Sequence, residues 1–111
     1  MAYSIAISLS ARRLQLYHDR ALMRNYPIGV GKFSTPTPIG RFTIASKSAN
    51  PGGPFGAMWL GLSVPRYGIH GTNNPASIGG LVSKGCIRMH NRDVLEVARL
   101  VTIGTPVLIG R

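Results

Sequence analysis

Cys86 is the only cysteine in this sequence, and a thiol becomes a strong nucleophile once it is ionised. A single cysteine excludes an internal disulfide and a cysteine-rich zinc site. A free thiol has a pKa of about 8.5, and neighbouring cations lower that value. Lys84 and Arg88 flank the cysteine closely. The segment therefore predicts a thiol that is activated for nucleophilic chemistry.

A nucleophilic thiol needs a histidine within hydrogen-bond reach to take its proton. His70 is the best candidate base because it follows a predicted strand, and Cys86 also lies at a strand-to-loop junction, where scaffolds present catalytic groups. His90 precedes a helix cap, and His18 lies in a predicted turn. On residue types and spacing alone, an inert buried cysteine and a structural histidine stay open as alternatives.

The acidic residues argue against two other kinds of site. Asp19, Asp93 and Glu96 are the only carboxylate side chains, and the last two lie three residues apart on one predicted helix. Such a pair is typical of helix capping and surface pairing, so a two-carboxylate glycosidase is not expected. The segment 29–34 lacks the third glycine and the following helix of a phosphate-binding loop.

Composition favours one small, mostly β domain over residues 1–111. A length of 111 residues suits a single domain, and 44% hydrophobic residues can build a modest core. The 14 glycines and 8 prolines favour many short strands joined by turns. Alternating or short apolar segments predict strands at 3–9, 13–17, 21–30, 41–45, 58–64, 67–71 and 106–109.

Helical signals are few. Asn74 followed by Pro75 predicts a brief helical turn that ends at Gly79. Residues 92–101 carry a single apolar stripe at helical spacing, with Asn91 as the expected cap. Residues 46–56 are rich in Ser, Asn, Gly and Pro and are expected to form a loop or a long hairpin tip.

The charge is strongly positive. Thirteen Lys and Arg against three Asp and Glu give +10, a field that attracts polyanions such as nucleic acid, anionic membrane or bacterial wall polymer. The basic residues are scattered and the aromatic residues fall mostly on predicted strands, so nucleic acid is not the expected partner. A role in solubility stays open. No apolar run reaches membrane-spanning length, and the first residues lack the pattern of a secretory signal.

Three ordered segments resemble one known family. His70-Gly71-Thr72-Asn73, the run from Ser83 to Met89 with Asn91, and the block Thr35–Phe42 are similar to the signature of the YkuD-type L,D-transpeptidases. That signature is a His-Gly pair, then Ser/Thr-x-Gly-Cys-hydrophobic-Arg, preceded by a Thr-Pro-x-Gly-x-Phe/Tyr block. The resemblance implies a small β-sandwich or barrel-like fold with one helix near the C-terminus and short helical turns.

The resemblance also implies roles for individual residues. Cys86 would be the nucleophile, and His70 the general base, with its ring oriented by a backbone carbonyl near Gly71. The backbone N–H groups of Lys84, Gly85 and Cys86 would stabilise the oxyanion, with glycine at 85 keeping side-chain atoms away from the substrate carbonyl. The remaining implied roles are loop support or carboxylate binding by Arg88, support by Ser83, and substrate binding by Asn73. Many family members have a second histidine where this chain has Lys84.

The implied reaction is acyl transfer on peptidoglycan stem peptides without a metal or cofactor. Terminal D-alanine would leave, a thioester would form, and an amine of a second stem would complete a third-to-third cross-link. Attack by water would instead make the enzyme an L,D-carboxypeptidase, and a non-catalytic basic polymer-binding domain is a further alternative. The resemblance also implies acylation by carbapenem-type β-lactams and a cell-wall, extracytoplasmic or spore-associated location. The loop 46–56 is a candidate lid.

Overall fold

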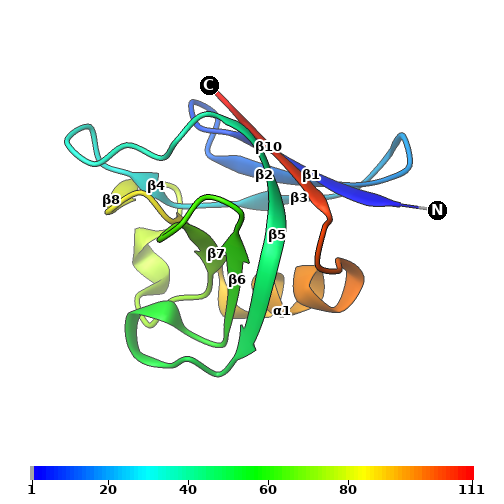
Figure 1. The fold of residues 1–111 in the computed structure, drawn as a ribbon. Helices are drawn as coiled ribbons and strands as arrows, with labels where there is room; N and C mark the ends of the chain where they lie inside the picture. Colours follow the sequence, from blue (N-terminus) through cyan, green and yellow to red (C-terminus); the bar gives the residue numbers. More distant parts are fainter. Residues whose placement is uncertain (1) are drawn as a thin grey trace.

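The computed structural model describes residues 2–111 and shows a curled β-sheet that encloses one helix (Figure 1). The strands are β1 (Tyr3–Ser8), β2 (Arg13–His18), β3 (Ala21–Pro27), β4 (Val30–Gly31), β5 (Gly40–Ala49), β6 (Met58–Leu62), β7 (Gly68–His70), β8 (Leu81–Ser83), β9 (Ile87–Arg88) and β10 (Pro106–Gly110). The helical elements are α1 (Asn91–Leu100) and the 3₁₀ turns η1 (Gly53–Phe55) and η2 (Pro75–Ser77). The mostly β prediction, with one helix and short helical turns, is confirmed.

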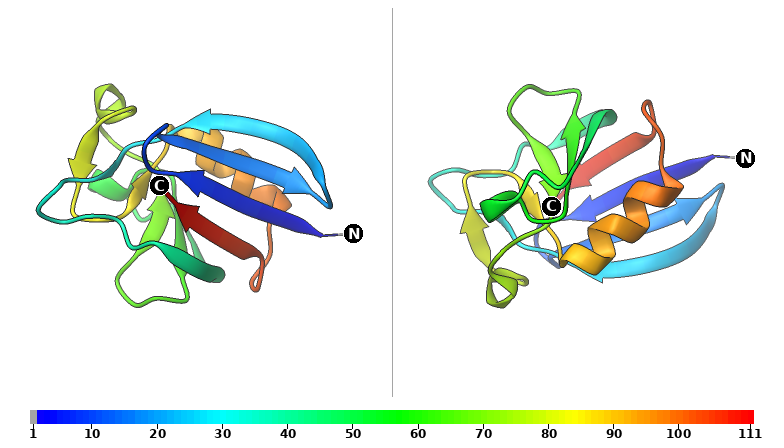
Figure 2. Two further views of the ribbon diagram at one scale, coloured as in Figure 1. Left: turned by 90° about the horizontal axis from the view of Figure 1, so that it is seen from above. Right: turned by 90° about the horizontal axis from the view of Figure 1, so that it is seen from below.

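The main sheet has eight strands in the order β3-β2-β1-β10-β5-β6-β7-β9, and β4 pairs separately with β8. Two neighbouring pairs in the main sheet, β1 with β10 and β7 with β9, are parallel. The long strand β5 pairs with β10 through its first residues and with β6 through its last. It therefore joins the two halves of the curled sheet, between which α1 lies (Figure 2).

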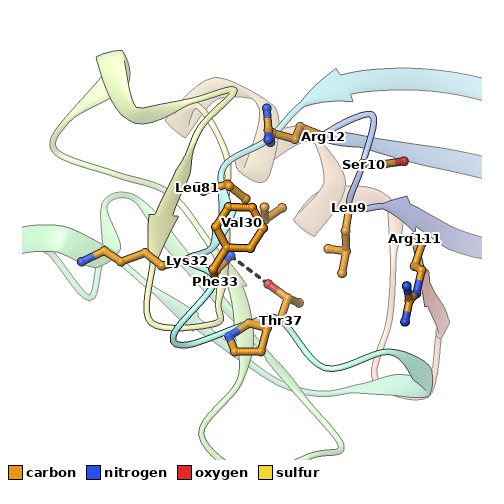
Figure 3. Close-up of a pocket in the computed structure, with 11 residues that line it drawn as sticks. Leu9, Ser10, Arg12, Val30, Lys32, Phe33, Thr37, Leu81 and Arg111 are labelled. Carbon is orange, nitrogen blue, oxygen red and sulfur yellow. Dashed lines mark hydrogen bonds between the residues drawn. The ribbon is translucent and has the colours of Figure 1, made fainter.

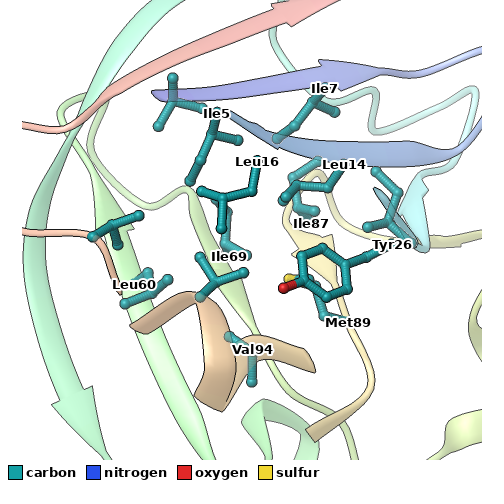
Figure 4. Close-up of a cluster of buried hydrophobic side chains, with 14 of the residues drawn as sticks. Ile5, Ile7, Leu14, Leu16, Tyr26, Leu60, Ile69, Ile87, Met89 and Val94 are labelled. Carbon is teal, nitrogen blue, oxygen red and sulfur yellow. The ribbon is translucent and has the colours of Figure 1, made fainter. Parts of the chain in front are cut away.

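The core fills the space between the sheet and the helix (Figure 4). Ile5 and Leu16 reach it from β1 and β2, and Val94 reaches it from α1. Ile69 of β7 and Ile87 of β9 are also almost completely buried. Burial of an aliphatic side chain of this size stabilises the fold by about 1.5–3 kcal/mol. The core consequently fixes which faces of β7 and β9 point inward.

The strand predicted over residues 21–30 is interrupted, which corrects the sequence prediction. β3 ends at Pro27, which has no N–H to donate to a ladder. Gly29 then exchanges two backbone hydrogen bonds with Arg88, of 2.7 and 2.8 Å. The chain thereby leaves β2, and Val30–Gly31 forms β4 beside β8. A local apolar pattern could not reveal this change of partner.

The segment 46–56, predicted as a loop or hairpin tip, begins as strand. β5 continues to Ala49 and pairs with β6, so only the remainder forms the tip with η1. The extension is polar and exposed, so it lacks the alternation that marks a half-buried strand. Lys47 anchors it by donating hydrogen bonds from Nζ to the carbonyls of Ala98, at 2.7 Å, and Val101.

The two helical predictions are confirmed in position. The turn after Asn74 is the 3₁₀ helix η2, and α1 covers Asn91–Leu100 where 92–101 was predicted. Asn91 was expected to cap α1, and this was wrong: His90 occupies the N-cap position without a side-chain capping bond. Among residues 2–111, no helix has the length and apolar character needed to cross a bilayer.

Replacing Lys47 by Met should lower the free energy of unfolding by about 1–2 kcal/mol, because two carbonyls at the C-terminal end of α1 lose a cationic donor. Urea titration measures the change. Ser48→Ala is the control, because Ser48 adjoins Lys47 on the same strand and makes no side-chain hydrogen bond within residues 2–111. Equal midpoints for the two variants would contradict the anchoring role.

Candidate active site

The parallel pairing of β7 and β9 brings the two predicted catalytic residues to one face. Ile69 lies opposite Ile87, and His70 lies opposite Arg88. Because side chains alternate along a strand, burial of both isoleucines turns His70, Arg88 and the preceding Cys86 to the other face. All three line one cavity of about 330 Å³. The structure thus brings together the thiol and the imidazole that the sequence singled out.

Backbone and aromatic contacts fix the imidazole of His70. Its Nδ1 lies 2.5 Å from the carbonyl oxygen of Gly71, so Nδ1–H donates and Nε2 is left as the basic nitrogen. The ring of Trp59 stacks on it, with centroids 5.6 Å apart and planes at 13°. The Phe55 ring packs edge-on against the His70 imidazole, with ring centroids 5.1 Å apart. No carboxylate takes part in this orientation.

Sequence reasoning missed both aromatic partners, because it placed Trp59 on a predicted strand and Phe55 in the predicted loop 46–56 without relating either residue to the site. Trp59 faces His70 directly across the antiparallel pair β6–β7. Side chains of directly opposed residues contact each other on the same face of a sheet. A predicted pairing of the two strands would have found Trp59, whereas Phe55 reaches the ring from the η1 turn, for which the sequence gives no pairing signal.

Asn91, the expected helix cap, instead joins the two loops beside His70. Its Oδ1 accepts hydrogen bonds from the backbone N–H groups of Ala57 and Thr72, each at 3.0 Å. Its Nδ2 donates to the carbonyl of Thr72 at 3.0 Å. A Cβ at Gly56 or Gly71 would lie 2.3 or 2.1 Å from Oδ1. The two glycines therefore make room for the Asn91 amide.

The loop that carries Cys86 is shaped by Ser83. The Ser83 hydroxyl accepts a hydrogen bond from the Gly85 N–H at 3.0 Å and donates to the Cys86 carbonyl at 2.7 Å. Gly85 has φ +120°, and a Cβ there would lie 2.4 Å from the Tyr67 ring. Glycine is thus required by backbone geometry and by Tyr67. Within residues 2–111, the amides of Lys84 and Cys86 have no hydrogen-bond acceptor.

The block Thr35–Phe42 supports the loop that carries Cys86. Thr35 Oγ1 donates to the carbonyl of Ser83 at 3.1 Å, and the Lys32 N–H donates to that carbonyl at 3.0 Å. Thr37 Oγ1 accepts from the Gly31 N–H at 3.0 Å. The block therefore ties β4 and β8 to the segment that leads into the cysteine, which gives this part of the signature a physical purpose.

Burial sets the protonation of the two reacting groups. Burial raises the pKa of the Cys86 thiol, while a hydrogen bond from the Gly68 N–H and the Arg88 charge act in the opposite direction. Burial also lowers the pKa of His70, against the hydrogen bond to Gly71 and together with the Arg88 charge. The net lowering of the thiol pKa expected from Lys84 and Arg88 was therefore wrong. Burial therefore favours the neutral form of both groups.

Of the other predicted site residues, some line the cavity and one does not. Lys84 and Arg88 line the cavity, and the Nε atom of Arg88 is buried without a hydrogen-bond partner within residues 2–111. Asn73, expected to bind substrate, is exposed and does not line this cavity. In the same described range, no group of three or more His, Cys, Asp and Glu side chains gathers as a metal site would require.

Comparison with known proteins places this geometry in a family. The model of the L,D-transpeptidase catalytic domain, YkuD, matches residues 2–109. The putative L,D-transpeptidase YkuD of Bacillus licheniformis is 62% identical over 107 residues, covering 96% of this chain and 65% of the relative. Its Bacillus subtilis counterpart is 60% identical over 109 residues, covering 98% and 66%. The chain thus spans just under two thirds of the length of these relatives.

Solved structures share the fold. The NMR structure of the catalytic domain of the E. faecium L,D-transpeptidase matches with a TM-score of 0.85 at 27% identity, over 96% of this chain and 95% of that one. L,D-transpeptidase 3 of Mycobacterium tuberculosis, solved with a faropenem-derived adduct, matches with a TM-score of 0.86 at 20% identity, over 99% and 60%. The fold expected from the resemblance is confirmed. With its family match, close relatives and shared fold, the chain belongs to the L,D-transpeptidase catalytic domain family.

Proposed function

We propose that residues 1–111 form a single catalytic domain that acts on peptidoglycan stem peptides through a thioester on Cys86. One observation carries this proposal: Cys86 and His70 open into the same cavity, and the Gly71 carbonyl holds His70 Nδ1 so that Nε2 is free. A thiol beside a base whose tautomer is fixed is the arrangement that nucleophilic acyl transfer requires. Membership of the family supports the substrate class.

The first half of the reaction forms the acyl-enzyme. His70 Nε2 removes the proton from Cys86 as Sγ attacks the carbonyl carbon between the third stem residue and terminal D-alanine. The N–H groups of Lys84 and Cys86 stabilise the negative oxygen, since the Gly85 N–H is already engaged by Ser83. The carbon–nitrogen bond then breaks, and the imidazolium returns the proton to the departing D-alanine amine. A thioester on Cys86 remains.

The second half transfers the acyl group. An amine of a second stem attacks the thioester, His70 takes its proton, and the sulfur leaves with that proton restored. The product is a third-to-third cross-link. The unpartnered Arg88 guanidinium in the cavity is suited to a stem carboxylate, which would also satisfy its buried Nε. No role is proposed for Asn73.

Two alternative functions remain for this chain. Water in place of the amine gives an L,D-carboxypeptidase with the same acyl-enzyme. A non-catalytic basic domain would bind wall polymer through the +10 charge and leave Cys86 unreactive. Transpeptidation is favoured over the second alternative because Cys86 is half-buried, lines the same cavity as His70 and is not sealed in the core.

The same nucleophile supports covalent inhibition by β-lactams. A β-lactam carbonyl presents a strained amide to the thiol, and the related M. tuberculosis enzyme was solved with a faropenem-derived adduct. Acylation of Cys86 by a carbapenem should add one inhibitor mass. Action on peptidoglycan also supports a cell-wall, extracytoplasmic or spore-associated location.

Cys86→Ala should abolish D-alanine release from tetrapeptide muropeptides, because the nucleophile is lost. His70→Ala should lower the rate about 10²–10⁴-fold through loss of the general base. His18→Ala is a matched control, because His18 packs on Tyr3 and does not line this cavity. Chromatography of products measures release and cross-linking. Undiminished release by Cys86→Ala would refute the mechanism, and release without cross-links at high amine concentration would establish the carboxypeptidase.

The pH profile of Cys86 alkylation should lie on the alkaline side of that of N-acetylcysteine. Burial raises the thiol pKa, and only the thiolate reacts with iodoacetamide. Arg88→Gln should move the profile further upward, because its charge favours the thiolate. The rate is followed by mass spectrometry from neutral to alkaline pH. A midpoint below that of N-acetylcysteine would instead indicate a resting thiolate–imidazolium pair.

Asn91→Ala should slow D-alanine release about tenfold or more, because the loop that carries Gly71 loses two hydrogen bonds and the loop at Ala57 loses one. Cys86 lies on a different loop, so its alkylation rate should change little. Asn73→Ala is the matched control and should leave both rates unchanged. A marked rise in the alkylation rate of Asn91→Ala would indicate general unfolding, which exposes the thiol, and would contradict a local positioning role.

A further inference from the structure

A second cavity, of about 310 Å³, lies where residues after β1 meet β4 and β8 (Figure 3). Leu9, Val30 and Leu81 supply apolar surface, and the Phe33 ring beside them is 91% exposed. A phenyl ring so exposed at the edge of an apolar hollow gains stability when a ligand covers it. The remaining lining residues are Ser10, Arg12, Gly31, Lys32, Pro36, Thr37 and Arg111.

The charges around this cavity are all positive. The side chains of Arg12, Lys32 and Arg111 line it, and among residues 2–111 no acidic side chain does. The salt bridges within residues 2–111 engage Glu96 and Asp93 with other arginines, so neither neutralises this cluster. An apolar hollow with unpaired cations at its edge favours a ligand that carries both small apolar groups and carboxylates.

Arg12 is held in an unusual state at this edge. Its φ is +53°, a conformation that is costly for a residue with a side chain. Its Nη1 donates to the Gly79 carbonyl at 3.3 Å, but its Nε is buried without an acceptor within residues 2–111. A buried donor without a partner costs stability unless a ligand or water satisfies it. The guanidinium therefore keeps unused hydrogen-bonding capacity at this edge of the cavity.

The second cavity is coupled to the first through β4 and β8. Lys32 lines both cavities, and its N–H donates to the Ser83 carbonyl at 3.0 Å. Val30 pairs with Leu81, three residues before Lys84. An extended ligand seated in the second cavity would reach the Cys86 side of this two-stranded sheet past Lys32.

We propose that the second cavity binds the acyl-acceptor stem peptide. This inference rests on the proposed function, for which it supplies the second substrate. A stem peptide combines alanine methyl groups, which suit the apolar floor, with free carboxylates, which suit Arg12 and Lys32. Binding there directs the acceptor amine along Lys32 toward the thioester. It also holds the amine close enough to compete with water, because a bound nucleophile has a high effective concentration.

The test uses a stem tripeptide with a side-chain amine on its third residue. This probe lacks the terminal D-alanine, so it can act only as acceptor. Titrated into Cys86→Ala protein, it should shift the backbone NMR signals of Leu9, Arg12, Phe33 and Leu81. Phe33→Ala and Arg12→Gln should each weaken its binding about fivefold or more. Arg13→Gln, with the same loss of charge one residue away and outside the cavity, should not.

Several results would overturn the proposal. The proposal fails if the tripeptide shifts only NMR signals of residues around the His70 and Cys86 cavity. It also fails if Arg12→Gln and Arg13→Gln bind the tripeptide with equal affinity. Tighter binding of a peptide-free glycan or a phosphate polymer at the same residues would reassign the cavity to that polymer.

Turnover separates this proposal from the function on which it rests. In protein with Cys86 intact, Phe33→Ala should raise the tripeptide concentration needed for half-maximal cross-linking and leave the rate of thioester formation unchanged. Absence of D-alanine release by the unmodified chain would refute the enzyme assignment. If Phe33→Ala releases D-alanine normally and needs the same tripeptide concentration for half-maximal cross-linking, only the acceptor site is refuted.

Discussion

The hydrogen bonds of the Asn91 side-chain amide are the interaction on which the geometry of the candidate site depends. The amide satisfies two backbone N–H groups and one carbonyl from two loops that have no ladder partners there. Leaving such groups buried and unpaired costs about 1–3 kcal/mol each. One of these loops supplies the carbonyl that orients His70, and the other leads from the turn that carries Phe55. A residue on the helix thus sets the position of the imidazole without contacting it.

A second constraint is the strict alternation of side chains on β7 and β9. Ile69 and Ile87 are drawn into the core, and their neighbours must then face the cavity. The hydrophobic effect that stabilises the domain therefore also aims the catalytic groups. Helix α1 contributes to both tasks, because Val94 packs in the core while Asn91 secures the loops. Folding and site assembly draw on the same contacts.

Sequence patterns predicted those parts of the molecule in which local periodicity reports burial. The alternation around Ile5 and the stripe around Val94 identified β1 and α1 correctly. The polar end of β5 and the two-residue strands β4 and β9 carry no such pattern, because distant partners stabilise them. The pairing of cysteine and histidine was predicted from residue type and resemblance. The Trp59 stack and the direction of the Cys86 pKa shift required knowledge of the burial around them.

The burial of the Cys86 thiol has a consequence for its chemical durability. Peroxides oxidise thiolates far faster than thiols, and each step beyond the sulfenic acid is hard to reverse. A sulfur whose pKa is raised by burial spends less time in the vulnerable thiolate form. With one cysteine in the chain, no second thiol could rescue it through an internal disulfide. Burial of the thiol therefore also limits its oxidation.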